Sequence, residues 1–260
     1  MTRTTAGRHR DQIHHQPDIA RAAALIADPS RARMLKALSD GRALPAGLLA
    51  AEAGVSAATA SAHLGKLVEA RLVTMESVGR CRYYSLAGPD ICLALEALAV
   101  IAPPLPVTSL RESSTAGALR RSRTCYDHLA GQLGVGLLES LLKAGLFAGH
   151  DGTHRPDEAV RDGARGYGHD VDYELTETGQ EELARFGVDL ARLPARRPLI
   201  RYCVDWSEQR HHLAGAVGAA LTARLFALRW LRYGSSPRVV HVTEEGADGL
   251  ADTFGLRLAD

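Results

Sequence analysis

The C-terminal half of the chain contains two sets of side chains that can bind a metal ion or carry out thiol chemistry. In each set a cysteine and an aspartate are separated by one residue, and histidine follows. Sulfur, imidazole nitrogen and carboxylate oxygen are all ligands of borderline transition metals. The sequence therefore predicts one site shared by the two sets, for a zinc, nickel, cobalt or copper ion. The predicted ligands are Cys125, Asp127, His128, Cys203, Asp205, His211 and His212.

The same residues allow three other interpretations. Oxidation of Cys125 and Cys203 is an alternative signal, because a cysteine near a helix N-terminus is biased toward the thiolate. The same helix field keeps His128 neutral. A pocket for a small organic ligand is the second alternative. The third is a structural role, in which the cysteines are small core residues and Asp127 and Asp205 cap helices.

The spacing of the second set limits a shared metal site. Asp205 and His212 would lie about 10 Å apart in a continuous helix, given a rise of about 1.5 Å per residue. The segment between them must therefore bend, or the two side chains do not bind the same ion. Asp205 and Glu208 also have the spacing of a capping box, which favours a helix start at this point.

A thiol enzyme is the hypothesis from another functional class. Cys125 with His128 or His212 has the residue types of a nucleophile and its general base. The sequence contains no nucleophile elbow, phosphate-binding loop or HExxH motif beside them. We therefore expect no enzymatic activity.

The two sets belong to an internal repeat. The segment Cys125–Gly131 is echoed by Cys203–Gly215, and the glycine and leucine spacing that follows is the same. A Thr-x-x-Gly motif then recurs at Thr176 and Thr243. The pattern predicts two winged-helix-like units, each with a helix, a strand and a helix, packed with pseudo-twofold symmetry. The predicted units are 120–195 and 196–260.

The N-terminal part has the pattern of a helix-turn-helix followed by a β-wing. Gly54 is placed for the turn, and Ser56 for the N-cap of a second helix whose apolar residues recur every three or four positions. Two strand-like runs follow and join at Gly79-Arg80. Such a helix enters the major groove of double-stranded DNA, and the wing tip contacts the backbone. The predicted DNA contacts are Ser56, Thr59, Ser61, His63, Lys66, Arg80 and Arg82.

This part of the chain resembles the ArsR/SmtB family of winged-helix repressors. The matching segments are Asp28–Leu38, Ser61–Leu64 and the wing Gly79–Leu86. The resemblance extends to about residue 100 and implies a homodimeric repressor that releases its DNA operator on sensing a signal. In that family the first and last helices form the dimer interface, which here corresponds to Ile19–Ala27 and Asp90–Val100.

The familiar metal ligands of that family are absent from this chain. Many members bind metal through cysteines in the helix that matches Leu44–Ala53, which contains no cysteine here. Others use Asp, His and Glu on the last helix, where this chain has Asp90, Cys92 and Glu96 but no histidine. The resemblance therefore implies that the signal enters elsewhere, and the repeated sets are the candidate. A winged-helix protein with no effector remains an alternative.

Composition bounds the class of protein and its compartment. The 260 residues are 46% hydrophobic, which favours a folded core over disorder. Their formal net charge of +1 argues against a general nucleic-acid coat protein. Residues 1–90 contain 12 Lys and Arg against 8 Asp and Glu, net +4; residues 91–260 contain the remaining 19 against 22, net −3. The basic excess falls on the predicted DNA-binding part. The four cysteines form no CxxC pair and no apolar run is long enough to span a membrane, so we expect a cytoplasmic protein without membrane contact.

The expected fold class is α+β, mainly α with small β-wings. A winged helix-turn-helix with dimer helices is expected at 1–101, a linker stiffened by prolines at 102–119, and an effector part of two repeats at 120–260.

Two polar segments outside this plan contain further histidines. A metal-binding role is open for both, but a frayed N-terminal arm and a wing or lid at 150–170 are the simpler interpretations. The histidines are His9, His14, His15, His150, His154 and His169.

Overall fold

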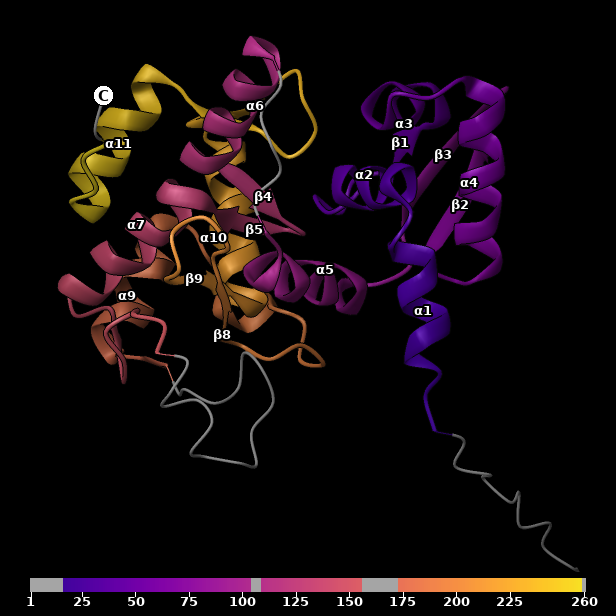
Figure 1. The fold of residues 1–260 in the computed structure, drawn as a ribbon. Helices are drawn as coiled ribbons and strands as arrows, with labels where there is room; N and C mark the ends of the chain where they lie inside the picture. Colours follow the sequence, from indigo (N-terminus) through magenta and orange to yellow (C-terminus); the bar gives the residue numbers. More distant parts are fainter. Residues whose placement is uncertain (1–15, 104–108, 156–172, 259–260) are drawn as a thin grey trace, which may run out of the picture.

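The computed structural model describes residues 16–103, 109–155 and 173–258, which form an N-terminal winged-helix part and a C-terminal part with helix α5 between them (Figure 1). The helices are α1 (Ile19–Ile26), α2 (Pro29–Ala37), α3 (Ala46–Ala53), α4 (Ala57–Glu69), α5 (Pro89–Ile101), α6 (Leu110–Arg121), α7 (Gly131–Lys143), α9 (Glu177–Phe186), α10 (Gly215–Ala227) and α11 (Glu244–Phe254). The strands are β1 (Leu44–Pro45), β2 (Val73–Val78), β3 (Cys81–Leu86), β4 (Arg123–Cys125), β5 (His128–Ala130), β6 (Phe147–Ala148), β7 (Glu174–Leu175), β8 (Arg201–Val204), β9 (His211–Ala214), β10 (Leu231–Tyr233) and β11 (Val240–Val242).

Some sequence predictions fall outside the described residues. They concern the arm with His9, His14 and His15, the linker residues 104–108, and most of the polar loop including His169.

The helix-turn-helix forms where the sequence predicts it. Gly54 ends α3 with a φ of +68°, and the Ser56 hydroxyl caps α4 by accepting the Thr59 N–H at 3.2 Å. The apolar face of α4 is buried at Ala60, Leu64 and Leu67, as its spacing indicates. The three-stranded sheet has the order β1-β3-β2, and the β2–β3 hairpin turns between Val78 and Cys81. The predicted α+β class with a winged-helix N-terminus is confirmed.

The first helix of this motif is shorter than predicted. We expected it to begin at Leu44, but Leu44 and Pro45 form β1 and pair with Tyr84 and Tyr83 of β3. Helix α3 therefore begins at Ala46. An edge strand accepts the proline because its missing N–H can face away from the neighbouring strand.

The C-terminal part has the order hairpin, helix, strand pair and helix twice in succession. The first run is β4–β5–α7–β6–β7–α9, and the second is β8–β9–α10–β10–β11–α11. The expected order of helix, strand and helix is incomplete, because each run begins with a hairpin. Tyr126, with a φ of +57°, makes the turn that allows Cys125 to pair with His128. The cysteine sets therefore lie in hairpins and not at helix N-termini as we expected.

The Thr-x-x-Gly motifs mark the starts of equivalent helices. The Thr176 hydroxyl accepts the Gly179 N–H at 3.0 Å at the start of α9, and the Thr243 hydroxyl accepts the Gly246 N–H at 3.0 Å at the start of α11. This is an N-cap interaction in both cases.

The two runs pack reciprocally through their helices and hairpins. Helix α7 packs on β9, and α10 packs on β5. A Cβ placed on Gly134 of α7 would lie 3.5 Å from the His212 Cβ, and one on Gly218 of α10 would lie 3.5 Å from the His128 Cβ. The same Cβ atoms would also overlap the carbonyl oxygens of Leu129 and Leu213, at 2.5 and 2.6 Å. Only glycine fits at these points, so each helix approaches the histidine of the other run closely.

The winged-helix and C-terminal parts are joined by buried polar contacts. Glu96 of α5 accepts a hydrogen bond from Arg238 at 2.5 Å, and both side chains are buried. The Tyr126 N–H in the β4–β5 turn donates to the Ser39 carbonyl at 2.6 Å, just after α2. The Arg42 guanidinium also stacks on the Tyr233 ring at 3.8 Å. The hairpin is thereby tied to both α2 and α5.

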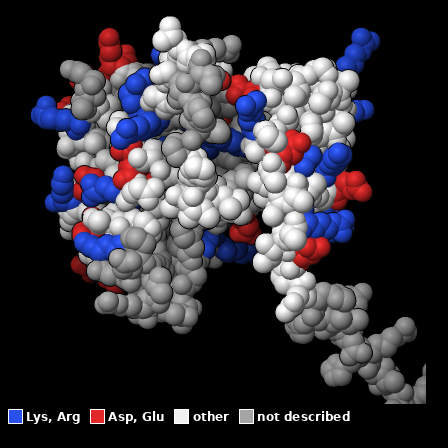
Figure 2. Space-filling view, viewed as in Figure 1, with Lys and Arg blue, Asp and Glu red and all other residues white. Residues whose placement is uncertain are grey.

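Large apolar side chains are exposed on α1 and on α5. Ile19 of α1 is 76% exposed, and Leu98 and Ile101 of α5 are 45% and 79% exposed. Figure 2 shows mainly uncharged surface where α5 lies between the two parts. No helix among the described residues is long and apolar enough to cross a membrane.

The close contacts of Gly134 and Gly218 predict that alanine destabilises the protein at these two positions but not at an uncrowded glycine. We expect Gly134→Ala and Gly218→Ala each to lower the free energy of unfolding by about 1–3 kcal/mol, because the new methyl group overlaps a backbone carbonyl. Gly65→Ala in α4 is the control: its Cβ meets nothing within 4 Å, so a gain of up to about 1 kcal/mol is expected. Urea unfolding followed by circular dichroism measures all three, and stable Gly134 and Gly218 variants would contradict the packing.

Candidate metal centre and nucleic-acid interface

Four of the seven predicted ligands meet in one buried group. One sulfur or ring nitrogen from each of Cys125, His128, Cys203 and His212 lies within 4.8 Å of the other three. Antiparallel pairing explains the meeting, because Cys125 lies opposite His128 in β4–β5 and Cys203 lies opposite His212 in β8–β9. The hairpins supply two thiols and two imidazoles to a common centre. The 10 Å separation expected along a helix does not arise, because the chain doubles back between Asp205 and His212.

Three of the four imidazole nitrogens of this group have no hydrogen-bond partner among the described residues. The Nε2 atoms of His128 and His212 are buried without a partner among the described residues, as is the His212 Nδ1. The two rings lie 5.2 Å apart between centroids. A buried polar atom without a partner costs free energy, and a metal ion bound by nitrogen would satisfy it. The arrangement fits a Cys2His2 donor set, which is typical of four-coordinate zinc.

Each histidine of the group has a carboxylate at its other nitrogen. The His128 Nδ1 is hydrogen-bonded to the Asp127 Oδ1 at 3.4 Å. The His212 Nδ1 lies 3.4 Å from the Asp205 Oδ2 as an ion-pair contact without a hydrogen bond. A carboxylate at this position orients the ring and makes it a more basic ligand. Asp127 and Asp205 are therefore placed beside the ligand group rather than in it.

Arginines from the opposite run neutralise these carboxylates. Arg123 donates to Asp205 at 2.8 Å, and Arg197 pairs with Asp127 through both terminal nitrogens. Burial raises the pKa of both carboxyls, but the hydrogen bonds and positive charges around them outweigh it and hold both pKa values well below the usual range. Sequence reasoning did not predict either arginine as a partner of these carboxylates, although Arg123 lies two residues before Cys125.

The protonation of the group differs from the sequence expectation. The hydrogen bond with Cys203, together with burial, raises the pKa of the Cys125 thiol to about 12. Burial lowers the pKa of His128, but the neighbouring Cys125 and Asp127 outweigh it and raise the value. We expected a thiolate-biased cysteine and a histidine held neutral by a helix field. Both expectations are wrong because the residues lie in a buried hairpin.

His211 lies apart from the four-residue group. Its ring stacks on Tyr202 at 4.0 Å between centroids, and its Nδ1 is 2.8 Å from the Tyr173 hydroxyl. Burial, followed by the positive charges of His150 and His154, lowers the pKa of His211 to about 3. In a β-strand, neighbouring side chains point to opposite faces, so His211 and His212 diverge.

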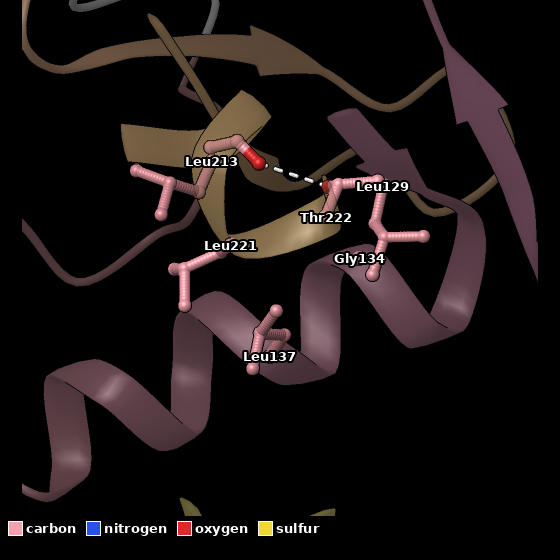
Figure 3. Close-up of a pocket in the computed structure, with 7 residues that line it drawn as sticks. Leu129, Gly134, Leu137, Leu213, Leu221 and Thr222 are labelled. Carbon is pink, nitrogen blue, oxygen red and sulfur yellow. Dashed lines mark hydrogen bonds between the residues drawn. The ribbon is translucent and has the colours of Figure 1, made fainter. Parts of the chain in front are cut away.

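A small hollow between α7 and α10 gives little support to an organic-ligand site. Figure 3 shows Leu137 of α7 and Leu221 of α10 beside it. Thr222 fills part of the wall and donates to the Gly218 carbonyl at 2.8 Å. Its volume of about 10 Å³ is roughly what one water molecule requires. The hollow is too small for an organic effector.

Most of the predicted DNA contacts are exposed. Ser61 and Lys66 lie on the solvent face of α4, and Arg80 and Arg82 lie at the tip of the wing. Ser56 and Thr59 are exposed at the start of α4.

His63 departs from the expected face. Its side chain is 17% exposed, and its Nδ1 lies 3.7 Å from Asp28 and 3.5 Å from the Arg31 guanidinium. It packs against α2 because residue 63 lies at the border between the apolar and polar faces of α4.

A winged helix with an exposed arginine-bearing wing and recognition helix defines a class of DNA-binding regulators. The helix-turn-helix domain family matches residues 26–76. The uncharacterized HTH-type transcriptional regulator YdfF of Bacillus subtilis (strain 168) is 38% identical over 231 residues, which cover 88% of this chain and 94% of that relative. The chain belongs to this family of helix-turn-helix transcriptional regulators.

Two solved structures are each similar to part of the chain. The cadmium metal sensor CMTR of Mycobacterium tuberculosis is 34% identical, covering 35% of this chain and 99% of that chain, with a TM-score of 0.28. The homodimeric winged helix-turn-helix DNA-binding domain Mb0332 of Mycobacterium bovis is 27% identical, covering 34% of this chain and 89% of that chain, with a TM-score of 0.30.

The burial of the cysteines predicts their reactivity. Cys81 is exposed on the wing, whereas Cys92, Cys125 and Cys203 are buried. We expect a thiol reagent such as iodoacetamide to label Cys81 rapidly in the folded protein and the others only after denaturation. Mass spectrometry of digested protein measures this, and Cys81→Ser should abolish the rapid labelling. Rapid labelling of Cys125 or Cys203 would contradict the buried centre.

Proposed function

We propose that this regulator senses a metal ion, which Cys125, His128, Cys203 and His212 would hold. The observation that carries the proposal is the convergence of four buried ligand-type side chains, three of whose imidazole nitrogens have no hydrogen-bond partner in the described part of the chain. Such an ion would supply a strong link between the two hairpins. The C-terminal part would then be the effector part at 120–260, and the winged helix would be the DNA-binding domain.

The charge of the site favours a divalent ion. Two thiolates and two neutral imidazoles carry a net charge of −2, which a zinc-type cation balances. The nearby carboxylates do not change this sum, because Arg123 pairs with Asp205 and Arg197 pairs with Asp127. A neutral complex is the one most compatible with full burial, since an unbalanced buried charge is costly.

A thiol-redox signal or catalysis at Cys125 has less support. A reactive cysteine is partly exposed and has a lowered pKa. Cys125 is fully buried and its pKa is raised to about 12. We therefore propose no enzymatic role for this cysteine.

We propose that residues 120–195 and 196–260 are two copies of one unit. The same order of elements, the equivalent threonine caps and the reciprocal approach of Gly134 and Gly218 support this. One ion at their pseudo-twofold axis takes a cysteine and a histidine from each copy.

The protein is proposed to act as a homodimeric repressor on double-stranded DNA. The exposed apolar residues of α1 and α5 support a dimer face, because apolar patches on a soluble protein often mark association sites. A dimer presents two recognition helices, which suit an operator with two half-sites.

Metal binding distinguishes the ligand group from its neighbours. We expect His212→Gln and Cys203→Ser to weaken zinc binding by at least about 100-fold, since each removes a ligand. His211→Gln is the matched control, being the adjacent buried histidine outside the group. Zinc content of tag-free protein and the thiolate charge-transfer absorption of its cobalt(II) form are the measurements. Equal loss in the His211 and His212 variants would refute the assignment.

DNA binding should depend on the exposed basic side chains of the winged helix. We expect Lys66→Ala, Arg80→Ala and Arg82→Ala each to weaken binding and to reduce the slope of log affinity against log salt by about 0.9 for each lost phosphate contact. Lys143→Ala, an exposed change on α7, is the control. Fluorescence anisotropy on a selected operator duplex at several salt concentrations measures the effect. Binding unchanged in all three variants would overturn this interface.

A further inference from the structure

A second group of ligand-type side chains lies beside the first, at the contact of α5 with β4. Cys92, Glu96 and Cys125 are all buried, and one possible ligand atom of each lies within 4.8 Å of the other two. Cys92 and Glu96 are four residues apart in α5 and so share one face of the helix. Cys125 belongs to both groups. The second group therefore combines residues of the winged-helix part and the C-terminal part.

One carboxylate oxygen of the buried Glu96 side chain has no hydrogen-bond partner among the described residues. Its Oε1 accepts from Arg238, but its Oε2 is buried without a hydrogen-bond partner in the part of the chain that the structure describes. Its pKa is lowered even though burial acts in the opposite direction, because Arg238 and Arg123 stabilise the carboxylate. An ionised carboxylate with an unpartnered oxygen next to two thiols can accept a cation.

We propose that Cys92, Glu96 and Cys125 form a second metal position, which takes a soft monovalent cation such as Cu(I), and that its occupancy is the signal read by α5. This inference rests on the proposed function, because Cys125 would be shared with the ion of the four-residue group.

Charge and ligand type select this class of ion. Arg238 already balances Glu96. The Cys92 thiol loses its proton to solvent when a cation binds, which adds one negative charge, and a monovalent ion restores neutrality. Thiolate sulfur favours soft ions such as Cu(I). A divalent ion would leave an uncompensated positive charge in a buried site.

The location explains why this second position would be regulatory. The four-residue group lies entirely within the C-terminal part, so an ion there links the two hairpins only. The second position bonds α5, which bears the exposed apolar face, to β4. The Cys92 thiol also donates to the Ser39 carbonyl at 3.6 Å, the same oxygen that accepts the Tyr126 N–H. Binding at Cys92 would break this contact with the end of α2.

Silver(I), a redox-inert soft monovalent ion, tests the proposal on the full-length protein loaded with zinc. We expect the wild type to take up one silver ion per chain more than Cys92→Ala does, at equal zinc content and in addition to any silver held by the exposed Cys81 thiol. Cys81→Ala, which removes the exposed wing thiol, is the matched control: it should lose only the silver held at the wing and keep the uptake that depends on Cys92. Metal content after gel filtration and operator affinity by anisotropy are measured together. Silver should change operator affinity about tenfold in the wild type and not in Cys92→Ala.

The possible outcomes separate the two proposals. Silver uptake by Cys92→Ala equal to that of the wild type, or loss of one zinc for each silver gained, would overturn the second position and leave the four-residue group intact. Absence of zinc binding in the wild type would overturn the proposed function. Silver uptake that survives in Cys203→Ser and is lost in Cys92→Ala would then still support the second position.

Discussion

Burial of two imidazoles and two thiols where the hairpins β4–β5 and β8–β9 meet is the constraint on which the C-terminal part depends. These groups are away from water, and their carboxylate neighbours are each neutralised by an arginine from the opposite run. Separating the runs would leave the fully buried charges of Arg123 and Asp205 without partners, which costs several kcal/mol. The polar network therefore fixes the relative position of the hairpins, while the leucines of α7 and α10 supply apolar burial around it.

The same network reaches the DNA-binding part through a short segment after α2. The Ser39 carbonyl accepts from the turn of the first hairpin, and the Lys36 ammonium lies over the Trp206 ring at 5.5 Å. Helix α2 in turn packs on α3 and α4, and Arg33 donates to the Ala53 carbonyl at the end of α3. A shift of the hairpin can thus be passed to the recognition helix through packed side chains and hydrogen bonds. Coupling of this kind requires two arrangements of different stability, which an effector then biases.

The chemistry of the thiols bears on the kind of signal. The pKa values of both Cys92 and Cys125 are raised. For Cys92 the main causes are its hydrogen bond with the Cys125 thiol and its burial. For Cys125 the first cause is its hydrogen bond with the Cys203 thiol. Such thiols are poor nucleophiles toward oxidants at neutral pH. A metal cation, in contrast, replaces the thiol proton and gains from the same burial that suppresses ionisation. The environment is therefore better suited to a metal than to a redox signal.

The sequence alone determined the local features of this protein. Ser56, Gly54 and the apolar spacing of Ala60, Leu64 and Leu67 predicted the recognition helix, because capping and helical periodicity are short-range properties. The repeated Cys and His residues likewise indicated four of the residues that meet in one group.

Only the tertiary structure decided which of the seven predicted ligands come together. Strand alternation turns His211 away from His212, and two arginines distant in sequence from their partners bind Asp127 and Asp205. The approach of Cys92 and Glu96 to Cys125 is not predictable from the sequence, although both residues lie on the predicted last helix. It depends on how α5 packs against β8, which brings Cys92 and Glu96 beside Cys125 of β4, and such long-range packing leaves no periodic signal in the sequence.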